Sequence, residues 1–231
     1  MKLVFISVIL LVFGSCLSPS KKNRGVVSLL YAKEPIDSAD YKHLKNDFYI
    51  GKDSDLYERK LALARDSNCN CQFEVFYDKF IFVHKNDSII KTPLGSIIDI
   101  NSFTIIDSTE FAKDKNRVYY FHGNSDGGNR VIVVGADPAS FKRLCEYRWG
   151  IDKDFVYYEN ARLNSINTEK LQVLNSPDTA DHFVSYLRDD KNVFFESTII
   201  PGADAATFKV VTGQSWDAED RNNKYYQGRR Y

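Results

Sequence analysis

Short polar clusters alternate with apolar and aromatic runs along most of the chain, and one pattern recurs. A polar turn followed by an apolar strand reads DKNRVYY at 114–120, DKDFVYY at 152–158 and DDKNVFF at 189–195. Asp and Asn favour turns because their side chains bond the nearby backbone, whereas Val and aromatic residues favour strands. Since apolar residues also precede each turn, every copy predicts a β-hairpin.

A second motif alternates with the first. It is an Asp turn closed by an aromatic residue, and it reads IDSADYKHL at 36–44, IDINSFTII at 98–106, ADPASFKRL at 136–144 and ADAATFKVV at 203–211. Asp is a favoured N-cap and Pro fits the first helical position. Asp137–Phe141 therefore predicts one helical turn that directs Phe141 into the core.

The spacing of the motifs is regular. Val118 and Val156 are 38 residues apart, and Val156 and Val193 are 37 apart. A period of this length is typical of repeat proteins, in which each unit buries the apolar face of its neighbour. The predicted fold is mainly β: tandem β-hairpin repeats of about 38 residues, joined by short helical turns into an antiparallel curved sheet array.

With these motifs the chain resembles the DKNYY family, bacterial proteins built from tandem repeats of the DKN-x-VYY type. The resemblance covers roughly residues 36–231 and is strongest over 111–211. It implies the repeat architecture and a location in the cell envelope, and it assigns no catalytic residue.

One segment, residues 52–77, departs from the repeat pattern. Asp55 and Glu58 are spaced as a capping box, which predicts a short helix over 55–66. Leu61 and Leu63 fit a strand equally well, because alternate residues of a strand share a face.

The amino terminus has the pattern of a signal peptide over residues 1–15. Lys2 precedes an apolar run from Leu3 to Phe13 that only Ser7 interrupts. As a helix this run is about 16 Å long, too short for the ~30 Å hydrocarbon core of a bilayer. It therefore predicts a cleaved signal rather than a permanent span.

The signal ends in Phe13-Gly14-Ser15-Cys16, which resembles a bacterial lipobox. The resemblance implies that Cys16 becomes the first mature residue and carries a lipid, so that the membrane is a partner. The alternative is a secreted protein with a free Cys16. Residues 16–25 are polar and predict a tether before a repeat domain over 26–231. Leu17 is not an acidic retention signal, which favours the outer membrane by resemblance to sorted lipoproteins.

Composition narrows the class of protein. The chain has 231 residues with 31 basic and 31 acidic side chains, and 43% of its residues are apolar. Nucleic-acid-binding proteins usually carry a positive excess, so no nucleic-acid partner is expected. Balanced charge and ordinary apolar content also argue against a disordered chain.

Candidate chemistry is sparse, and we predict no enzyme, no cofactor and no metal site. The histidines lack the spacing of metal ligands. The most enzyme-like stretch is 122–129, which contains His122 and Ser125, but it is interpreted as an enlarged flexible loop. The DKN triplets are interpreted as turns rather than calcium loops, because a valine follows where calcium needs an oxygen ligand.

Cysteine chemistry stays open. Cys69 and Cys71 would point to one side of a strand about 7 Å apart, which is awkward for a mutual disulfide. Cys145 could pair with either in an oxidising envelope. Buried thiols are the alternative.

The aromatic strands have two apolar faces. One face carries Val118, Val156 and Val193, and the other carries the candidate binding ladder Tyr49, Tyr119, Tyr157, Phe194 and Tyr225. The ladder is either a second packed layer, which ordinary burial favours, or an exposed surface for sugars or a protein.

The leading functional hypothesis is an envelope-anchored, non-catalytic interaction or scaffold lipoprotein that binds an unidentified envelope protein. The first alternative is a carbohydrate- or peptidoglycan-binding lipoprotein that uses the ladder. The second is a hydrolase centred on His122 and Ser125.

Overall fold

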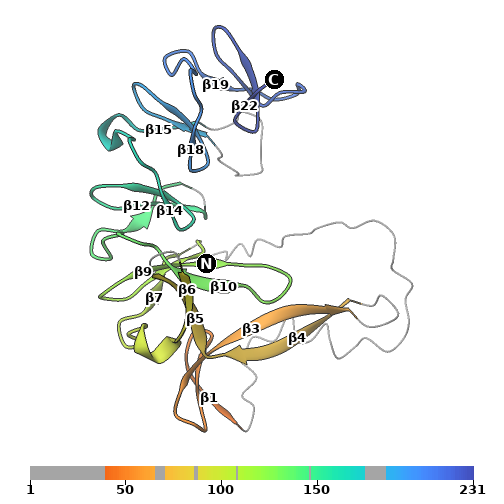
Figure 1. Cartoon of the computed structure of the whole chain (residues 1–231), viewed down its shortest axis with the longest axis vertical. Coiled ribbons are helices and arrows are strands. Elements are labelled where there is room, and N and C mark those ends of the chain that lie inside the picture. The colour runs from red at the N-terminus through yellow and green to blue at the C-terminus, as the bar shows by residue number, and fades with distance from the viewer. Residues whose placement is uncertain (1–39, 66–70, 86–87, 108, 146, 175–185) are drawn as a thin grey trace, which may run out of the picture. The chain divides into compact units, whose positions relative to one another are not determined.

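Short antiparallel strands account for most of the regular structure (Figure 1). The computed structural model describes residues 40–65, 71–85, 88–107, 109–145, 147–174 and 186–231. These fall within the unit Asp37–Tyr231, and they confirm the mainly β prediction. Their helical segments are the 3-10 turns η1 (Leu94–Ser96) and η2 (Thr168–Lys170). No helix in these ranges is long and apolar enough to cross a membrane.

The predicted signal peptide, Cys16 and the tether lie outside the described residues. Cleavage and lipidation therefore stay predictions.

The first sheet has the order β1-β2-β3-β4, with β1 (Tyr41–Lys45), β2 (Phe48–Gly51), β3 (Leu56–Arg65) and β4 (Cys71–Asp78). The helix expected over 55–66 is wrong, because this segment forms β3 and pairs with β4 along its length. Leu56, Glu58 and Lys60 are buried while the residues between them are half-buried, which is the period of a strand. Glu58 is held by Arg130, 72 residues away, a partner that no local pattern reveals.

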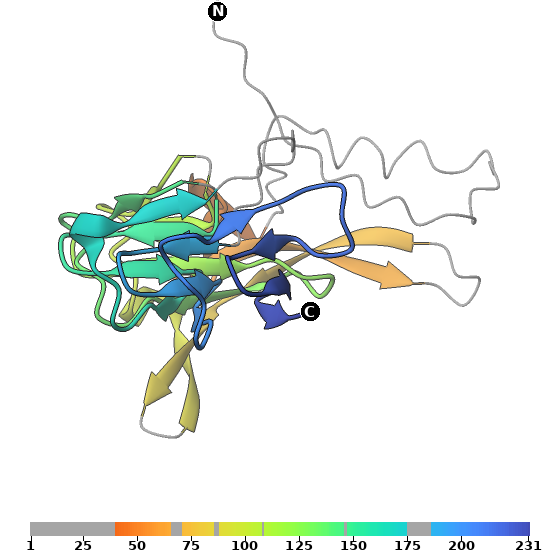
Figure 2. The same ribbon diagram turned by 90° about the horizontal axis from the view of Figure 1, so that it is seen from above.

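The second sheet has the order β6-β5-β10-β9-β8-β7. Its strands are β5 (Phe80–Lys85), β6 (Ser88–Pro93), β7 (Thr104–Ile105), β8 (Phe111–Lys113), β9 (Val118–His122) and β10 (Asn129–Ile132). The hairpin of β5 and β6 joins the rest of the sheet by a single parallel pairing, Phe82 with Val131. Figure 2 shows this hairpin as the yellow pair of strands that extends out of the sheet.

Three further sheets are four-stranded antiparallel meanders. The third contains β11 (Lys142–Arg143), β12 (Trp149–Ile151), β13 (Val156–Tyr158) and β14 (Ala161–Arg162). The fourth contains β15 (Gln172–Leu174), β16 (Tyr186–Arg188), β17 (Val193–Phe195) and β18 (Thr198–Ile199). The fifth contains β19 (Lys209–Val210), β20 (Ala218–Glu219), β21 (Lys224–Tyr226) and β22 (Arg229–Arg230). The DKN-type hairpins are confirmed as the central strand pairs of these sheets.

The motif that connects the sheets also has the predicted local form. Phe141 N donates to Asp137 O at 2.9 Å, which closes one helical turn, and Phe141 is buried. Phe208 N makes the same bond to Asp204 O. The turn therefore places an aromatic residue in the core at equivalent points of two repeats.

The core consists of successive clusters to which neighbouring sheets contribute opposite faces. Tyr157 packs with Val118 of the preceding sheet, whereas its neighbour Val156 packs with Phe194 of the next. Val193 in turn packs with Tyr225. Both faces of the central strands are consequently used in packing, as expected for repeats that bury one another's apolar surface.

Candidate functional site

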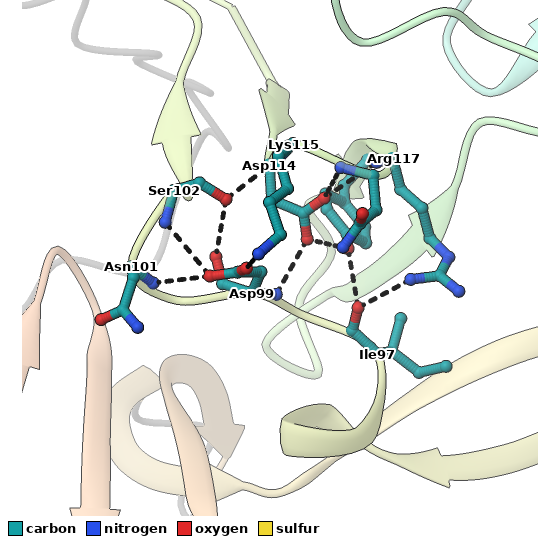
Figure 3. A network of polar contacts seen from close by, with 9 residues as sticks. Ile97, Asp99, Asn101, Ser102, Asp114, Lys115 and Arg117 are labelled. Atoms are coloured by element: carbon teal, nitrogen blue, oxygen red, sulfur yellow. Dashed lines mark hydrogen bonds and ion pairs between the residues drawn. The ribbon is translucent and has the colours of Figure 1, made fainter.

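The most regular polar feature is the Asp at the start of each DKN-type turn. Asp114 Oδ1 accepts the N–H groups of Asn116 and Arg117 at 2.7 and 2.8 Å. Its Oδ2 accepts the Tyr119 hydroxyl at 2.6 Å and the Asp99 N–H at 2.9 Å. Figure 3 shows this network, in which Asp114 joins its own turn to the turn of the preceding motif.

The same arrangement recurs in the later repeats. Each equivalent aspartate accepts two N–H groups of its own turn: Asp152, Asp189 and Asp220. Each also accepts one N–H from the preceding motif, which comes from Asp137, Asn167 and Asp204, respectively. Tyr157 and Tyr225 donate to this Asp as Tyr119 does, and Phe194 replaces the tyrosine in the fourth sheet. The aspartates thus tie the two motifs of each repeat together.

The Asp of the preceding motif is engaged from the other side. Asp137 Oδ1 accepts Ala139 N–H at 3.1 Å, and its Oδ2 accepts the Ser140 hydroxyl at 2.8 Å. Ser140 Oγ then accepts the N–H of Lys153 in the DKN-type turn at 3.2 Å. The carboxylates therefore serve as acceptors for turn N–H and hydroxyl groups, the role that the turn interpretation predicts. Within the described ranges, no group of three or more His, Cys, Asp or Glu side chains is placed to hold a metal ion.

The networks change the acidity of the carboxyl groups. Burial works to raise the pKa of Asp220, but the Tyr225 hydroxyl and three backbone N–H groups outweigh it and lower the pKa from 3.8 to about 2. The pKa values of Asp152 and Asp189 are lowered by the same balance of burial against N–H donors. These groups remain ionised as acceptors at neutral pH.

The candidate binding ladder is buried, so the exposed interpretation of it is wrong. Each of its five side chains has a relative exposure of 0%: Tyr49, Tyr119, Tyr157, Phe194 and Tyr225. The physical reason is that Tyr119, Tyr157, Phe194 and Tyr225 each belong to a core cluster shared with a neighbouring sheet. Tyr49 packs against the rings of Tyr77 and His43. The alternative favoured from ordinary burial, a second packed layer, describes these residues.

The structure does not bring His122 and Ser125 together. His122 Nε2 forms a hydrogen bond of 2.8 Å with Asn160 Oδ1, and its Nδ1 lies 3.6 Å from Glu159. Ser125 is exposed at a turn. A nucleophile and its base need to lie within hydrogen-bond reach, and these two side chains form no hydrogen bond with each other.

The loop that contains them is not an open connection. Lys60 Nζ donates to Gly128 O at 3.2 Å, and a Cβ on Gly127 would lie 2.4 Å from the Phe76 ring. Gly127 and Gly128 have φ values of +94° and +76°, which explains why the loop requires glycine. The interpretation of 122–129 as a simple flexible enlargement is therefore wrong, because its second half packs against β3 and β4.

Cys145 is half-buried against the third core cluster. Cys69 lies outside the described residues, and Cys71 belongs to β4. The possible disulfides among Cys69, Cys71 and Cys145 stay a prediction.

A groove of about 410 Å³ lies between the fourth and fifth repeats. One of its cations, Arg188, donates to Ala205 O and Phe208 O at 2.6 and 3.0 Å, and its buried Asp189 holds the turn described above. Arg188 therefore joins the fourth sheet to the turn that precedes the fifth.

Exposed apolar side chains point to a different surface, the β5–β6 hairpin. Ile89 and Ile90 of β6 are 62 and 43% exposed, and they are neighbours on an edge strand. Among the residues whose burial is described, the other large exposed apolar residues are Leu44, Ile105, Val134, Ile199, Tyr226 and Tyr231. Sequence reasoning missed this surface, because neither repeat motif nor the candidate binding ladder includes residues 88–93. The available signal was the Ile pair between Ser88 and Lys91.

The comparison with protein families decides the relationship of the chain to known proteins. The DKNYY family model matches residues 77–229, well over half of the chain. The protein belongs to the DKNYY family. No curated protein and no solved structure matches it. The DKNYY match spans the β5–β6 hairpin and the four sheets that follow the first.

Proposed function

We propose that this DKNYY protein is a lipid-anchored, non-catalytic scaffold of the bacterial cell envelope that binds another envelope protein. A lipid on Cys16, followed by the polar residues 17–25, would hold the repeat domain at the membrane surface. The absence of an acidic residue at position 17 favours the outer membrane.

The observation that carries the binding proposal is that the aromatic side chains predicted to bind are buried, whereas two isoleucines of β6 are exposed. The aromatic ladder is buried and the repeat aspartates join the turns of successive motifs, whereas Ile89 and Ile90 remain exposed on the two opposite faces of β6. Exposed apolar residues on an unpaired edge strand are a feature of interaction surfaces. We therefore assign partner binding to the β5–β6 hairpin, defined by Phe80–Lys85 and Ser88–Pro93.

The anchor is tested by Cys16→Ser in the source cell. The wild-type chain is expected in the membrane fraction, with a mass that includes acyl chains, and the variant in the soluble fraction. Equal fractionation of the two chains would contradict the lipid anchor.

The binding proposal is tested by capture of the tagged full chain from detergent-solubilised envelope. Ile89→Ser/Ile90→Ser is the test variant, and Ile105→Ser/Val134→Ser is the matched control, because it also removes two exposed apolar side chains. We expect one protein to be enriched by the wild type and the control and lost with the test variant. Equal recovery with both variants would remove the hairpin from the proposal.

Glycan binding is a second candidate, supported at a surface other than the ladder. Tyr226 and Tyr231 of the fifth sheet are 51 and 68% exposed, and Lys224 Nζ lies 3.5 Å from the ring centroid of Trp216 beside them. Aromatic rings with polar neighbours suit ligands that have both apolar and polar faces. Retention on immobilised peptidoglycan that Tyr226→Ala/Tyr231→Ala abolishes would favour this candidate over the protein scaffold.

Hydrolysis centred on His122 and Ser125 is the weakest hypothesis, since His122 is paired with Asn160 instead. Replacement of both residues by Ala is expected to leave partner capture unchanged. If the wild type hydrolyses a substrate and the folded double variant does not, the hydrolase hypothesis would be supported.

A further inference from the structure

The free edge of β6 differs from most sheet edges in the described part of the chain. β6 is the terminal strand of its sheet and has six residues, of which five are exposed and Thr92 is half-buried. Six other edge strands have two residues each: β7, β11, β14, β18, β19 and β22. β4 is a longer edge, but its residues 75–78 are half-buried. Natural sheets usually keep such edges short or covered, because an open edge pairs readily with another strand.

The backbone polarity of β6 follows from its pairing with β5. Leu94 N donates to Lys79 O at 2.8 Å, in the same register that pairs Ile81 with Thr92 and Phe82 with Lys91. In an antiparallel ladder, hydrogen-bonded and non-hydrogen-bonded pairs alternate. Thr92 and Ile90 therefore bond toward β5, whereas the N–H and C=O groups of Ile89 and Lys91 point away from it.

We propose that β6 is a strand-addition site, at which an extended segment of the partner protein pairs with the outward backbone groups of Ile89 and Lys91. This inference rests on the proposed function and names how the partner is held. A row of alternating backbone donors and acceptors is complementary to another extended backbone, and pockets or side chains on either face then add selectivity. Pro93, which has no N–H, ends the pairing surface.

Charge selects among the strands that could pair there. Lys91 is the single charged residue of β6, and its Nζ lies 4.5 Å from the ring centroid of Phe80. Opposite charges across a strand pair are stabilising and like charges are destabilising. The side chains of Ile89 and Lys91 share one face of β6, and Ile90 lies on the other. The site therefore favours a segment that places acidic residues on the Lys91 face and apolar residues on the Ile90 face. A second copy of β6 would bring another lysine to the edge.

The probe is a ten-residue synthetic peptide in which valine alternates with glutamate, added to the full lipidated chain in detergent. Amide hydrogen exchange is expected to slow at Ile89 and Lys91 when the peptide binds. The same peptide with alternate backbone nitrogens methylated keeps its side chains but cannot complete the ladder, and it should bind about tenfold more weakly or worse. A valine–lysine peptide tests the charge preference and is expected to bind more weakly than the acidic one.

Variants of Lys91 distinguish the contribution of its backbone N–H to peptide binding from that of its side chain. Lys91→Pro removes the outward N–H together with the lysine side chain, a change that edge strands tolerate, and is expected to lower the affinity for an uncharged alternating peptide about tenfold relative to Lys91→Ala. Lys91→Ala keeps the N–H and should retain most of the affinity for an uncharged alternating peptide. Because a proline variant could fail to fold, the methylated peptide on the wild-type chain gives the same answer independently.

The outcomes distinguish this inference from the proposed function. Equal affinity for methylated and unmethylated peptides, or no binding of the acidic peptide at all, would overturn strand addition. If envelope capture by the wild type then persists and Ile89→Ser/Ile90→Ser abolishes it, the partner docks on side chains, and the scaffold proposal stands without strand pairing. Capture of a second copy of this chain by β6 would overturn the hetero-partner. Failure of the wild type to capture any protein would count against both.

Discussion

The Tyr157 hydroxyl donates a 2.9 Å hydrogen bond to Asp152 Oδ2, the same oxygen that accepts the backbone N–H of Asp137. Three parts of the repeat meet at this atom: the DKN-type turn, the strand that follows it and the turn of the preceding motif. Tyr157 also packs against the preceding sheet, so one side chain serves both the polar network and the core.

Loss of the Asp152 carboxylate should destabilise the repeat domain strongly. Asp152→Ala leaves the N–H groups of Asp137, Asp154 and Phe155 without their acceptor, and we expect a loss of about 3 kcal/mol or more in the free energy of unfolding. Urea denaturation measures this loss. Asp154→Ala, at an exposed position two residues away, is the control and should change stability by under about 0.5 kcal/mol.

The hydroxyl of Tyr157 can be tested without disturbing the packing. Phe194 occupies the equivalent position in the next sheet and is equally buried, so the core accepts a phenylalanine ring there. We expect Tyr157→Phe to cost about 1–2 kcal/mol, because the ring remains while a hydrogen bond to a buried carboxylate is lost. Tyr226→Phe, at an exposed ring, should be close to neutral. If the two variants are equally stable, the hydroxyl contributes little.

Acid should weaken the domain through the repeat aspartates. The pKa of Asp220 is lowered to about 2 in the folded state, whereas an unfolded Asp titrates near its ordinary value of 3.8. A depressed folded pKa contributes stability that is complete above the unfolded pKa and is lost as pH falls from about 4 toward 2. Urea midpoints measured between pH 6 and pH 2.5 should therefore fall with pH. Asp220→Asn is expected to lower the midpoint at pH 6 and to reduce its dependence on pH, and an unchanged slope would contradict this assignment.

Much of the repeat was predictable because its signals are local. The DKN-type turns depend on an Asp that bonds N–H groups two and three residues ahead, so the triplet itself predicts the hairpin. The helical turn at Asp137–Phe141 follows from the capping preferences of Asp and Pro in the same way. The regular spacing then predicted that these hairpins follow one another in tandem.

The remaining features depend on distant partners. A strand with two apolar faces does not reveal whether both are covered, and Tyr157 is buried only because a preceding sheet lies against it. Glu58 and Lys60 look exposed in the sequence, but they are buried with Arg130 and Asp78. The edge at Ile89 is open because no strand in the described chain pairs with β6 on the side away from β5. The residues of β6 alone do not show whether a further strand pairs there.

The fifth sheet shows a change at the face that the other repeats use for packing. Lys224 is exposed at the position where Val118, Val156 and Val193 are buried, and Tyr231 lies beside it where Ile200 occupies the equivalent place in the fourth sheet. The charge of Lys224 on this face opposes the stacking of a further apolar face against it.

Restoring the apolar face should therefore promote association. Lys224→Val/Tyr231→Ile recreates Val193 and Ile200, which are buried in the preceding sheet, and we expect the variant to self-associate with increasing concentration in analytical ultracentrifugation. Lys142→Val, at an exposed edge position, is the matched control and should remain as monodisperse as the wild type. Identical sedimentation of both variants would show that this face does not limit stacking.

The central claim, that the β5–β6 hairpin binds another protein in the envelope, is tested most directly by site-specific photocrosslinking in the source cell. A photoreactive side chain is placed at Ile89 in one full-length chain and at Ile105, another exposed apolar position, in a second. We expect one discrete crosslinked protein from position 89 and none from position 105. The same product from both positions, or none from position 89 while position 105 crosslinks, would contradict the claim.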